Sequence, residues 1–283
     1  MRPKNKKIPI ATLCTIVGVS KSGYYGWLAH THQPDKDEED YVVIKEIFDK
    51  SKRKYGWRSI HMRLTEQGVA MNHKKVQRIM RKYHLFAKIR RRNPYKMIMK
   101  KSHEHRTCEN ILDRQFIQDT PFIVFGTDIT YLKYNNRFAY LSAVKDFATG
   151  EIVAWQLKEH IDMSLVTETL EHLKRNTGIP TLTDVLIHSD QGFHYTNPLY
   201  ISMIKSFNMI QSMSRKGNCI DNAPTESFFG HLKDDVDYKQ CKTFQELYTL
   251  IEQYMTYYNT QRHQWHKNKM TPVQYRDHLL ALA

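Results

Sequence analysis

The pattern of hydrophobic and polar positions changes at about residue 120. Before this point apolar residues recur at helical spacing, and after it come short runs rich in β-branched and aromatic residues. Asn135-Asn136 and Thr149-Gly150 separate the first three of these runs, which predicts antiparallel strands joined by tight turns. The predicted strands are Phe122–Tyr131, Phe138–Phe147 and Ile152–Leu157.

Helical and strand-like segments alternate in the rest of the chain. The expected order is a helix, a short buried strand, a helix, a strand and a helix, at Ser164–Asn176, Val185–Ile187, Pro198–Phe207, Met209–Met213 and from about Asn222 or Ala223 onward. Three antiparallel strands followed by this alternation predict a mixed five-stranded α/β sheet with helices on both faces. A last amphipathic helix, Phe244–Tyr258, precedes what we expect to be a polar, basic tail.

Two helix-turn-helix patterns precede the sheet. The first has helices at Ile10–Val17 and Lys21–Ala29, with Ser20 as the cap of the second. The other has an amphipathic helix at Ser59–Gln67 and a helix capped by Asn72, with a glycine turn between them. An acidic stretch at 33–40 leads into the helix between the two patterns, so the region before residue 94 is predicted to be all helical.

Charge is distributed unevenly between the two halves. The chain has a net charge of +14, but residues 1–110 hold 26 Lys and Arg against 10 Asp and Glu, and the remainder holds 17 against 19. Residues 72–92 contain nine basic residues and no acid, so one face of that helix is predicted to be uniformly positive and to contact phosphate groups. The basic candidates are Lys74, Lys75, Arg78, Arg81, Lys82, Arg90, Arg91 and Arg92.

Membrane insertion and secretion are not expected. The sequence has no apolar run of about 18 residues and no signal-peptide pattern at its start. Its four cysteines, at positions 14, 108, 219 and 241, have no paired spacing of the kind that disulfide frameworks or zinc ribbons show. We therefore expect reduced thiols in a cytoplasmic protein.

Three acidic side chains stand out in the predicted α/β region. Asp128 lies within the first strand, Asp190 directly follows the short strand, and Glu226 lies in the first turn of a helix. Each alone is weak evidence, but such a cluster of acids repels itself unless divalent cations neutralise it, and carboxylate oxygens are preferred ligands of Mg²⁺ or Mn²⁺. Asp146 and Asp221 are competing acids, to which we assign a structural role and a capping or helper role.

Spacing within the last helix adds a basic residue to this set. Glu226 follows Asp190 with 35 residues between them, and Lys233 comes seven residues after Glu226. At about 100° per residue, Glu226 and Lys233 differ by roughly 20° around the helix axis, so they share one face. Taken by itself this pair could equally be a solvated helix face.

Several segments carry a family resemblance: Thr127–Tyr131, His188–Gly192, Asp221–Lys233, Val19–Tyr25, Tyr55–Ile60, Val76–Met80, Tyr257–Asn259 with Arg262, and Thr271-Pro272. Together they resemble the transposases of bacterial insertion sequences of the IS-three family, which belong to the DDE transposase and retroviral integrase superfamily. The resemblance spans nearly all 283 residues. The 35-residue spacing with Lys233 seven residues beyond Glu226 is its most specific part.

The resemblance implies an RNase H-like integrase core in which Asp128, Asp190 and Glu226 hold two Mg²⁺ or Mn²⁺ ions. It implies two-metal phosphodiester transfer at the ends of an insertion sequence. Lys233 would contact DNA near the element end. His188 and Asn222 are candidates for supporting the metal ligands or touching DNA, although a packed neighbour and a loop cap are equally good interpretations of these two residues.

These expectations divide the chain into four parts: a helix-turn-helix-like segment at 1–36, a basic helix-turn-helix DNA-binding domain at 37–93, a linker at 94–119 and the RNase H-like catalytic domain with C-terminal helices at 120–283. The resemblance also implies a bacterial, nucleoid-associated protein. The expected partners are double-stranded DNA, further copies of the chain on that DNA, and an upstream-frame product, alone or as a frameshift fusion. Two alternatives stay open, namely a DNA-binding regulator with an idle core and a generic RNase H-like nuclease.

Overall fold

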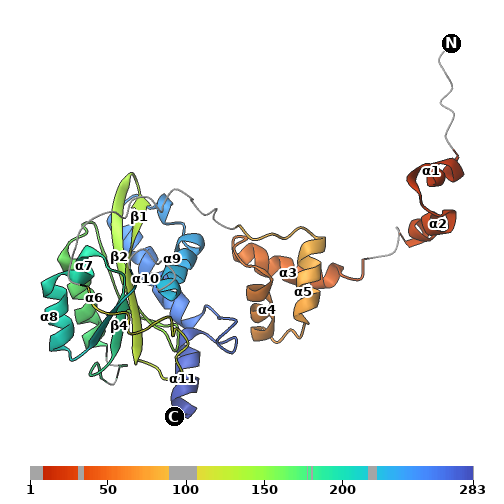
Figure 1. Cartoon of the computed structure of the whole chain (residues 1–283). Coiled ribbons are helices and arrows are strands. Elements are labelled where there is room, and N and C mark those ends of the chain that lie inside the picture. Colours follow the sequence, from red (N-terminus) through yellow and green to blue (C-terminus); the bar gives the residue numbers. More distant parts are fainter. Residues whose placement is uncertain are drawn as a thin grey trace.

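A computed structural model describes residues 9–30, 35–88, 107–176, 178–179, 181–215 and 222–282 of the chain (Figure 1). The first two helices form where their capping residues predict. α1 (Ile10–Val17) ends at Gly18, which has the left-handed φ of 73° that glycine adopts without strain. The Ser20 hydroxyl accepts a hydrogen bond of 3.0 Å from the Gly23 amide and so caps α2 (Lys21–His30).

The next three helices, α3 (Glu38–Lys50), α4 (Trp57–Glu66) and α5 (His73–Lys82), form the helix-turn-helix domain. A side-chain oxygen of Asn72 accepts a hydrogen bond of 2.9 Å from the Lys74 amide and fixes the start of α5, as predicted. Apolar side chains from all three helices meet in one core: Ile44, Ile47, Phe48, Ile60, Leu64, Val76, Ile79, Met80 and Leu85.

Five strands form the predicted mixed sheet, in the order β3-β2-β1-β4-β5. β2 is antiparallel to both of its neighbours, β1 and β3, whereas β4 runs parallel to β1 and β5 runs parallel to β4. Asn135 and Asn136 have φ values of 36° and 59°, which a tight two-residue hairpin turn requires. The strands are β1 (Val124–Tyr134), β2 (Arg137–Asp146), β3 (Ile152–Lys158), β4 (Leu186–Ser189) and β5 (Ile210–Met213).

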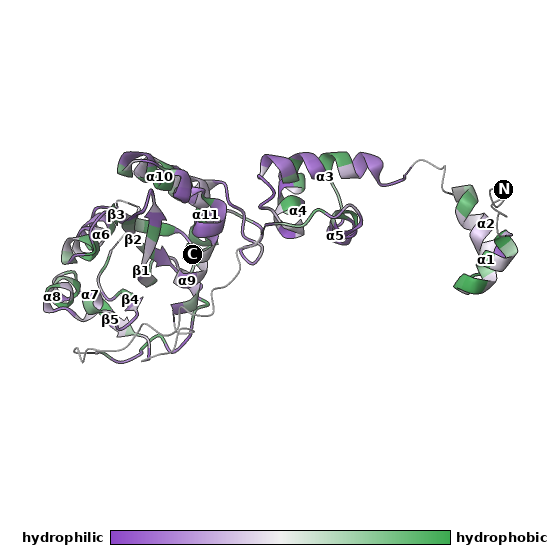
Figure 2. Ribbon diagram, turned by 90° about the horizontal axis from the view of Figure 1, so that it is seen from above, coloured by the Kyte–Doolittle hydropathy of each residue, from purple (hydrophilic) through white to green (hydrophobic). Residues whose placement is uncertain are grey.

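Helices cover both faces of the sheet, as Figure 2 shows from above. Because side chains alternate along a strand, Ala143 of β2 belongs to the core under α9 and α10, and Val144 belongs to the core under α6 and α8. This architecture confirms the predicted fold class. The elements are α6 (Met163–Arg175), α7 (Phe193–Thr196), α8 (Pro198–Ser206), α9 (Ala223–Asp235), the short 3-10 helix η3 (Tyr238–Gln240) and α10 (Phe244–Thr260).

Asp146 is a structural residue, as expected. Its side chain is fully buried at the end of β2 and accepts hydrogen bonds from the Phe122 amide and from both the amide and the hydroxyl of Thr149. Burial raises the pKa of this carboxyl group. The carboxylate therefore ties the turn after β2 to the start of β1.

The polar, basic segment after residue 258 contains a further helix, α11 (Pro272–Leu282), whose bounds were not predicted. The sequence marks the start of this helix, because Thr271 is followed three residues later by Gln274. In the structure the Thr271 hydroxyl accepts a hydrogen bond from the Gln274 amide, and the Gln274 side chain accepts one from the Thr271 amide. Such a reciprocal pair, followed by Pro272 in the first turn, is a strong helix start.

Residues 107–119, which the sequence assigns to a linker, lie against the sheet. The side chain of Leu112 is buried with Val124 and Phe147, and the Leu112 amide donates to the Ser212 hydroxyl. The Met213 amide donates to the carbonyl of Glu109 at 3.2 Å, alongside the edge strand β5. This half of the assigned linker therefore packs as part of the sheet domain.

No helix in the described parts of the chain is both long and apolar enough to cross a membrane. Cys14, Cys108 and Cys241 are free thiols, and Cys219 lies outside the described residues.

Candidate active site

The parallel pairing of β1 and β4 places Asp128 beside Asp190. Gly126 is the register partner of His188, and each aspartate comes two residues later in the same direction along its own strand. Two residues are one full repeat of the strand, so the two aspartates occupy equivalent positions on neighbouring strands, which lie about 4.8 Å apart in a sheet. Asp128 lies inside β1, and Asp190 directly follows the end of β4. Both side chains are half-buried.

A backbone amide holds one oxygen of each aspartate. The Ile129 amide donates to Oδ1 of Asp128 at 2.8 Å, and the Gly192 amide donates to Oδ1 of Asp190 at 2.8 Å. A Cβ atom at Gly192 would lie 2.7 Å from that same oxygen of Asp190, so only glycine permits this close approach. These contacts fix how both carboxylates are oriented.

Tyr195 of α7 lies near this pair and was not singled out from the sequence. Its side chain is buried, and burial together with the negative charges of Asp128 and Asp190 raises its pKa well above the usual value. The phenol is therefore a neutral group close to two acids. No local pattern points to it, because its position depends on how α7 packs in one core with Phe125 of β1 and Ile187 of β4.

The start of α9 lies directly on β1 next to Asp128. The side-chain amide of Asn222 donates to the Thr127 carbonyl at 3.3 Å, and a Cβ atom at Gly126 would lie 2.6 Å from the Thr225 hydroxyl. Lys145 of β2 donates to the Pro224 carbonyl at 3.1 Å. The first turn of α9 is thus anchored to two strands of the sheet.

Further along α9, Lys233 also contacts β1. Its ammonium group donates to the Thr130 hydroxyl and lies 4.8 Å from the centre of the Tyr131 ring. Asn222, Glu226 and Lys233 fall within an arc of about 40° around the helix. Asn222 contacts β1 at Thr127 and Lys233 contacts it at Thr130, on either side of Asp128. Glu226 therefore lies on the side of α9 that faces β1, and its side chain is exposed.

The three predicted metal ligands do not meet in one compact cluster. Among the described residues, no three His, Cys, Asp or Glu side chains converge closely enough to hold a metal ion. The structure instead brings Asp128 and Asp190 together by strand register and places Glu226 on the adjacent helix. Their role as ligands stays a prediction.

Of the two supporting candidates, His188 is fully buried, and its Nδ1 lies 2.9 Å from the Ser212 hydroxyl. Asn222 is also buried, and its side chain makes no capping hydrogen bond to α9. It holds the backbone of β1 instead, one residue before Asp128. Its Oδ1 atom is buried with no hydrogen-bond partner within the described part of the chain.

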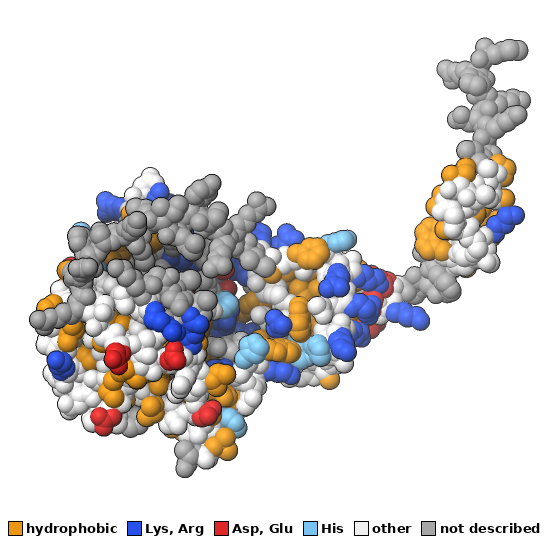
Figure 3. All heavy atoms as spheres, viewed as in Figure 1, with side chains coloured by type: hydrophobic (Ala, Val, Ile, Leu, Met, Phe, Trp, Pro, Cys, Tyr) orange, Lys and Arg blue, Asp and Glu red, His pale blue; other side chains and the backbone are white. Residues whose placement is uncertain are grey.

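The face of α5 is not uniformly positive, contrary to expectation. Arg78 forms a two-pronged ion pair with Asp37 at 2.6 and 2.7 Å, and Lys82 lies 2.6 Å from Asp35. Lys75 pairs with Asp40 at 2.5 Å. Figure 3 shows basic side chains gathered over this domain with acidic ones beside them.

Asp35 and Asp37 come from the stretch before α3, and Asp40 comes from its first turn; the sequence assigned these positions to an acidic stretch and a helix start. A hydrogen bond from the ammonium group of Lys82 lowers the pKa of Asp35 to about 2, so this carboxyl group stays charged near neutral pH. Lys74 and Arg81 are the predicted contacts on α5 that remain exposed outside these pairs. Arg90, Arg91 and Arg92, like Asp221, lie outside the described residues.

Comparison with known proteins agrees with this architecture. Residues 35–93 match the model of an HTH-like domain, and residues 118–219 and 226–280 match models of an integrase core domain. The two core matches contain the strands and the helix that carry the acids.

Two relatives from one organism match over almost their whole length. The chain is 34% identical over 272 residues to a protein of Escherichia coli (strain K12) named as a transposase, InsK, for insertion sequence element IS150, covering 95% of this chain and 94% of that protein. It is 29% identical to the transposase InsF for insertion sequence IS3A of the same organism, over 96% of this chain and 95% of that protein. A chain of the simian T-cell lymphotropic virus intasome aligns over 83% of this chain and 74% of its own with a TM-score of 0.48 and 16% identity. The chain belongs to the IS-three family of insertion-sequence transposases.

Proposed function

We propose that the chain cleaves DNA at the ends of an insertion sequence and joins those ends to target DNA. The proposal rests on one placement: Asp128 of β1 lies beside Asp190, which follows the neighbouring strand β4, and the helix that carries Glu226 is anchored to β1 on either side of Asp128. Acids in this arrangement suit phosphodiester transfer, because a phosphate that is attacked in line gains negative charge and needs cations held nearby.

Asp128, Asp190 and Glu226 would hold the divalent cation. The donor set fits, since all three supply hard carboxylate oxygens and two of them are brought together with their orientation fixed by backbone amides. Bound Mg²⁺ or Mn²⁺, two ions in the family arrangement, would activate the attacking hydroxyl and stabilise the leaving oxygen.

The other residues of the site support these acids or bind the substrate. Tyr195 supplies a buried, neutral phenol close to the pair. Asn222 fixes the β1 backbone beside Asp128. Lys233 presents its ammonium group beside Thr130, where it can attract a DNA phosphate or contact a base.

The helix-turn-helix domain would bind the DNA, with α5 as its basic helix. We propose double-stranded element ends and target DNA as the partners, bound by more than one copy of the chain. An upstream-frame product, separate or fused by frameshifting, completes the proposed assembly.

The test is an assay of the purified chain, with and without its upstream-frame partner, on labelled element ends in Mg²⁺. Cleavage at the element boundary followed by joining to a second duplex is the expected result. Binding without cleavage in either Mg²⁺ or Mn²⁺ would favour the regulator, and cleavage without preference for the end or joining would favour the nuclease. Either of these outcomes would overturn the proposal.

Replacing Lys233 by methionine is expected to lower the rate of end joining at limiting DNA by about 10-fold, because a charge-assisted hydrogen bond to DNA is lost. The rate is measured in single turnovers over a range of DNA concentrations. Lys239→Met, which removes an exposed lysine from η3, serves as the matched control. Equal rates for the two variants would remove Lys233 from the DNA contacts.

The double variant Lys74→Gln/Arg81→Gln is expected to weaken DNA binding at all sequences. Each lost phosphate contact reduces the slope of log affinity against log salt by about 0.9, so the pair should reduce it by roughly 2. Binding is measured by fluorescence anisotropy at several salt concentrations. Lys50→Gln on α3 is the control, and an unchanged slope in the double variant would show that this side of α5 does not face DNA.

A further inference from the structure

The helix-turn-helix domain is docked on the sheet domain through a defined surface (Figure 1). On one side are Lys54, Tyr55 and Trp57, and on the other are Asp235, Tyr257 and Trp265; we call these six residues the docking interface. They come from segments about 180 to 210 positions apart in the sequence. Neither the family models nor the proposed reaction assigns a role to this contact.

In the polar half of the docking interface, Lys54 binds the end of α9. The ammonium group of Lys54 donates to the carbonyl of Asp235, the last residue of α9, at 2.6 Å, and lies 3.4 Å from Oδ1 of Asp237. A cation at the carbonyl end of a helix is favourable because the last carbonyls lack helical partners and carry partial negative charge. The Lys54 side chain is only 17% exposed, so this contact is sheltered from water.

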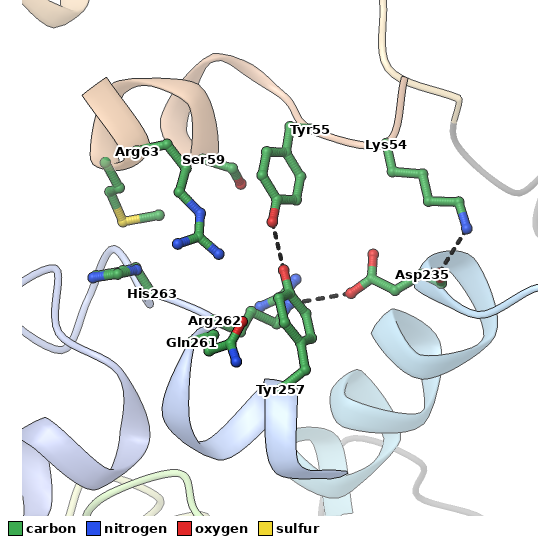
Figure 4. Close-up of a pocket in the computed structure, with 10 residues that line it drawn as sticks. Lys54, Tyr55, Ser59, Arg63, Asp235, Tyr257, Gln261, Arg262 and His263 are labelled. Carbon is green, nitrogen blue, oxygen red and sulfur yellow. Dashed lines mark hydrogen bonds and ion pairs between the residues drawn. The ribbon is translucent and has the colours of Figure 1, made fainter. Parts of the chain in front are cut away.

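Side chains of the sheet domain bind the same end of α9. Oδ2 of Asp235 accepts from the Tyr254 hydroxyl at 3.0 Å and from Nε of Arg262 at 3.2 Å. Beside it, the hydroxyl groups of Tyr55 and Tyr257 lie 2.5 Å apart, as Figure 4 shows. Asp235 therefore joins α9, α10 and the helix-turn-helix domain at one point.

The aromatic half of the docking interface surrounds Trp265. Its ring packs edge-on against the rings of Trp57 at 5.4 Å and His61 at 5.9 Å. Burial lowers the pKa of His61, as does the nearby charge of Lys269, so this ring is neutral at pH 7. Flat rings packed at several angles restrict sliding and rotation more than a single polar contact would.

Docking leaves the candidate DNA-binding side of α5 open. Lys74 and Arg81 are exposed. The interface uses the segment before α4 and the start of α4, against the end of α9, α10 and the segment that follows it. On α5 its ring contact is made by His73, the first residue, whose ring lies 6.4 Å from that of Trp265. The contact therefore does not mask the basic helix. It fixes where that helix lies relative to the sheet domain.

We propose that the docking interface sets which phosphodiester bond is cut, by fixing the distance from the DNA-binding helix to the acids of the active site. α9 is the connecting element: it has 13 residues, about 20 Å of rigid helix, with the docked domain held at its last residue and Glu226 in its first turn. A DNA end bound by α5 is thereby presented to the acids at one position. This inference rests on the proposed function, because it needs the chain to cut DNA.

The first test measures docking without any reaction. Spin labels are placed on exposed positions through Asp49→Cys on α3 and Ser202→Cys on α8, with Cys108 and Cys219 replaced by serine. The otherwise unaltered protein should give one narrow distance distribution. The interface variant Lys54→Met/Tyr55→Phe/Tyr257→Phe should give a broad one, and a second variant that adds Trp265→Ala a broader one still. A broad distribution in the unaltered interface would overturn the proposal.

The second test maps the cut position on labelled element ends in Mg²⁺. The interface variants should lose on the order of 10- to 100-fold of the product at the main position and gain products at neighbouring bonds, because small misplacements of reacting groups are costly. The control Lys50→Met/Tyr41→Phe/Tyr248→Phe makes the same chemical changes away from the interface. Absence of any cutting by the unaltered protein would defeat the proposed function itself. Unaltered cutting by variants with broad distances would overturn the positioning role alone.

Discussion

Replacing Asp128 or Asp190 by asparagine is expected to reduce strand transfer by on the order of 10³-fold or more, while DNA affinity stays within about two-fold. Asparagine keeps the shape of the side chain and can keep the hydrogen bond from the backbone amide of Ile129 or Gly192. It removes the negative charge that a divalent cation needs. The loss should therefore fall on the chemical step, and it is measured in single turnovers with saturating protein.

The same argument applies to Glu226→Gln on α9. Asp184→Asn and Glu252→Gln are matched controls, because both change an exposed acid by the same atoms outside the candidate site. Thermal unfolding of all five proteins should agree closely. Full strand transfer by any one of the three site variants would remove that residue from the ligand set and leave the proposed chemistry without its basis.

Local signals account for how much of this site could be predicted. The start of α9 was predicted because Asn222 and Pro224 are short-range helix-start residues, and the strand with Asp128 because its turn residues and β-rich pattern lie within a few positions. The pairing of Asp128 with Asp190 then follows from the parallel register of β1 and β4. The neighbouring position of the two acids thus depends on the fold class, which the order of elements predicts.

Contacts between distant segments account for what could not be predicted. Asp35 and Asp37 lie more than 40 positions before the Lys82 and Arg78 that they neutralise, so a count of charges along α5 overstated its positive face. Tyr195 likewise acquires its place near the acids only when α7 packs in one core with β1 and β4. The docking of Tyr55 on Tyr257 joins positions 202 residues apart. None of these three long-range contacts produces a periodic pattern in the sequence.

The tight packing around Gly126 could not be predicted from the sequence either, because it involves three separate segments of the chain. Gly126 of β1 lies between Phe147 and Thr225 of α9, and a Cβ atom there would be 2.3 Å from the Phe147 ring and 2.6 Å from the Thr225 hydroxyl. Real Cβ contacts are not this short, so any side chain at position 126 must separate β1 from its neighbours. Glycine here is required by packing rather than by backbone angles.

Gly126→Ala is accordingly expected to lower the free energy of unfolding by about 1–3 kcal/mol through overpacking. It should also lower strand transfer by on the order of 10²-fold, because α9 carries Glu226 and would move away from Asp128. Calorimetry and single-turnover joining measure the two effects. The control is Gly230→Ala on α9, where an added Cβ meets nothing within 4 Å and should stabilise the helix by up to about 1 kcal/mol. If Gly126→Ala were destabilised but fully active, the spacing between α9 and β1 would not govern the chemistry.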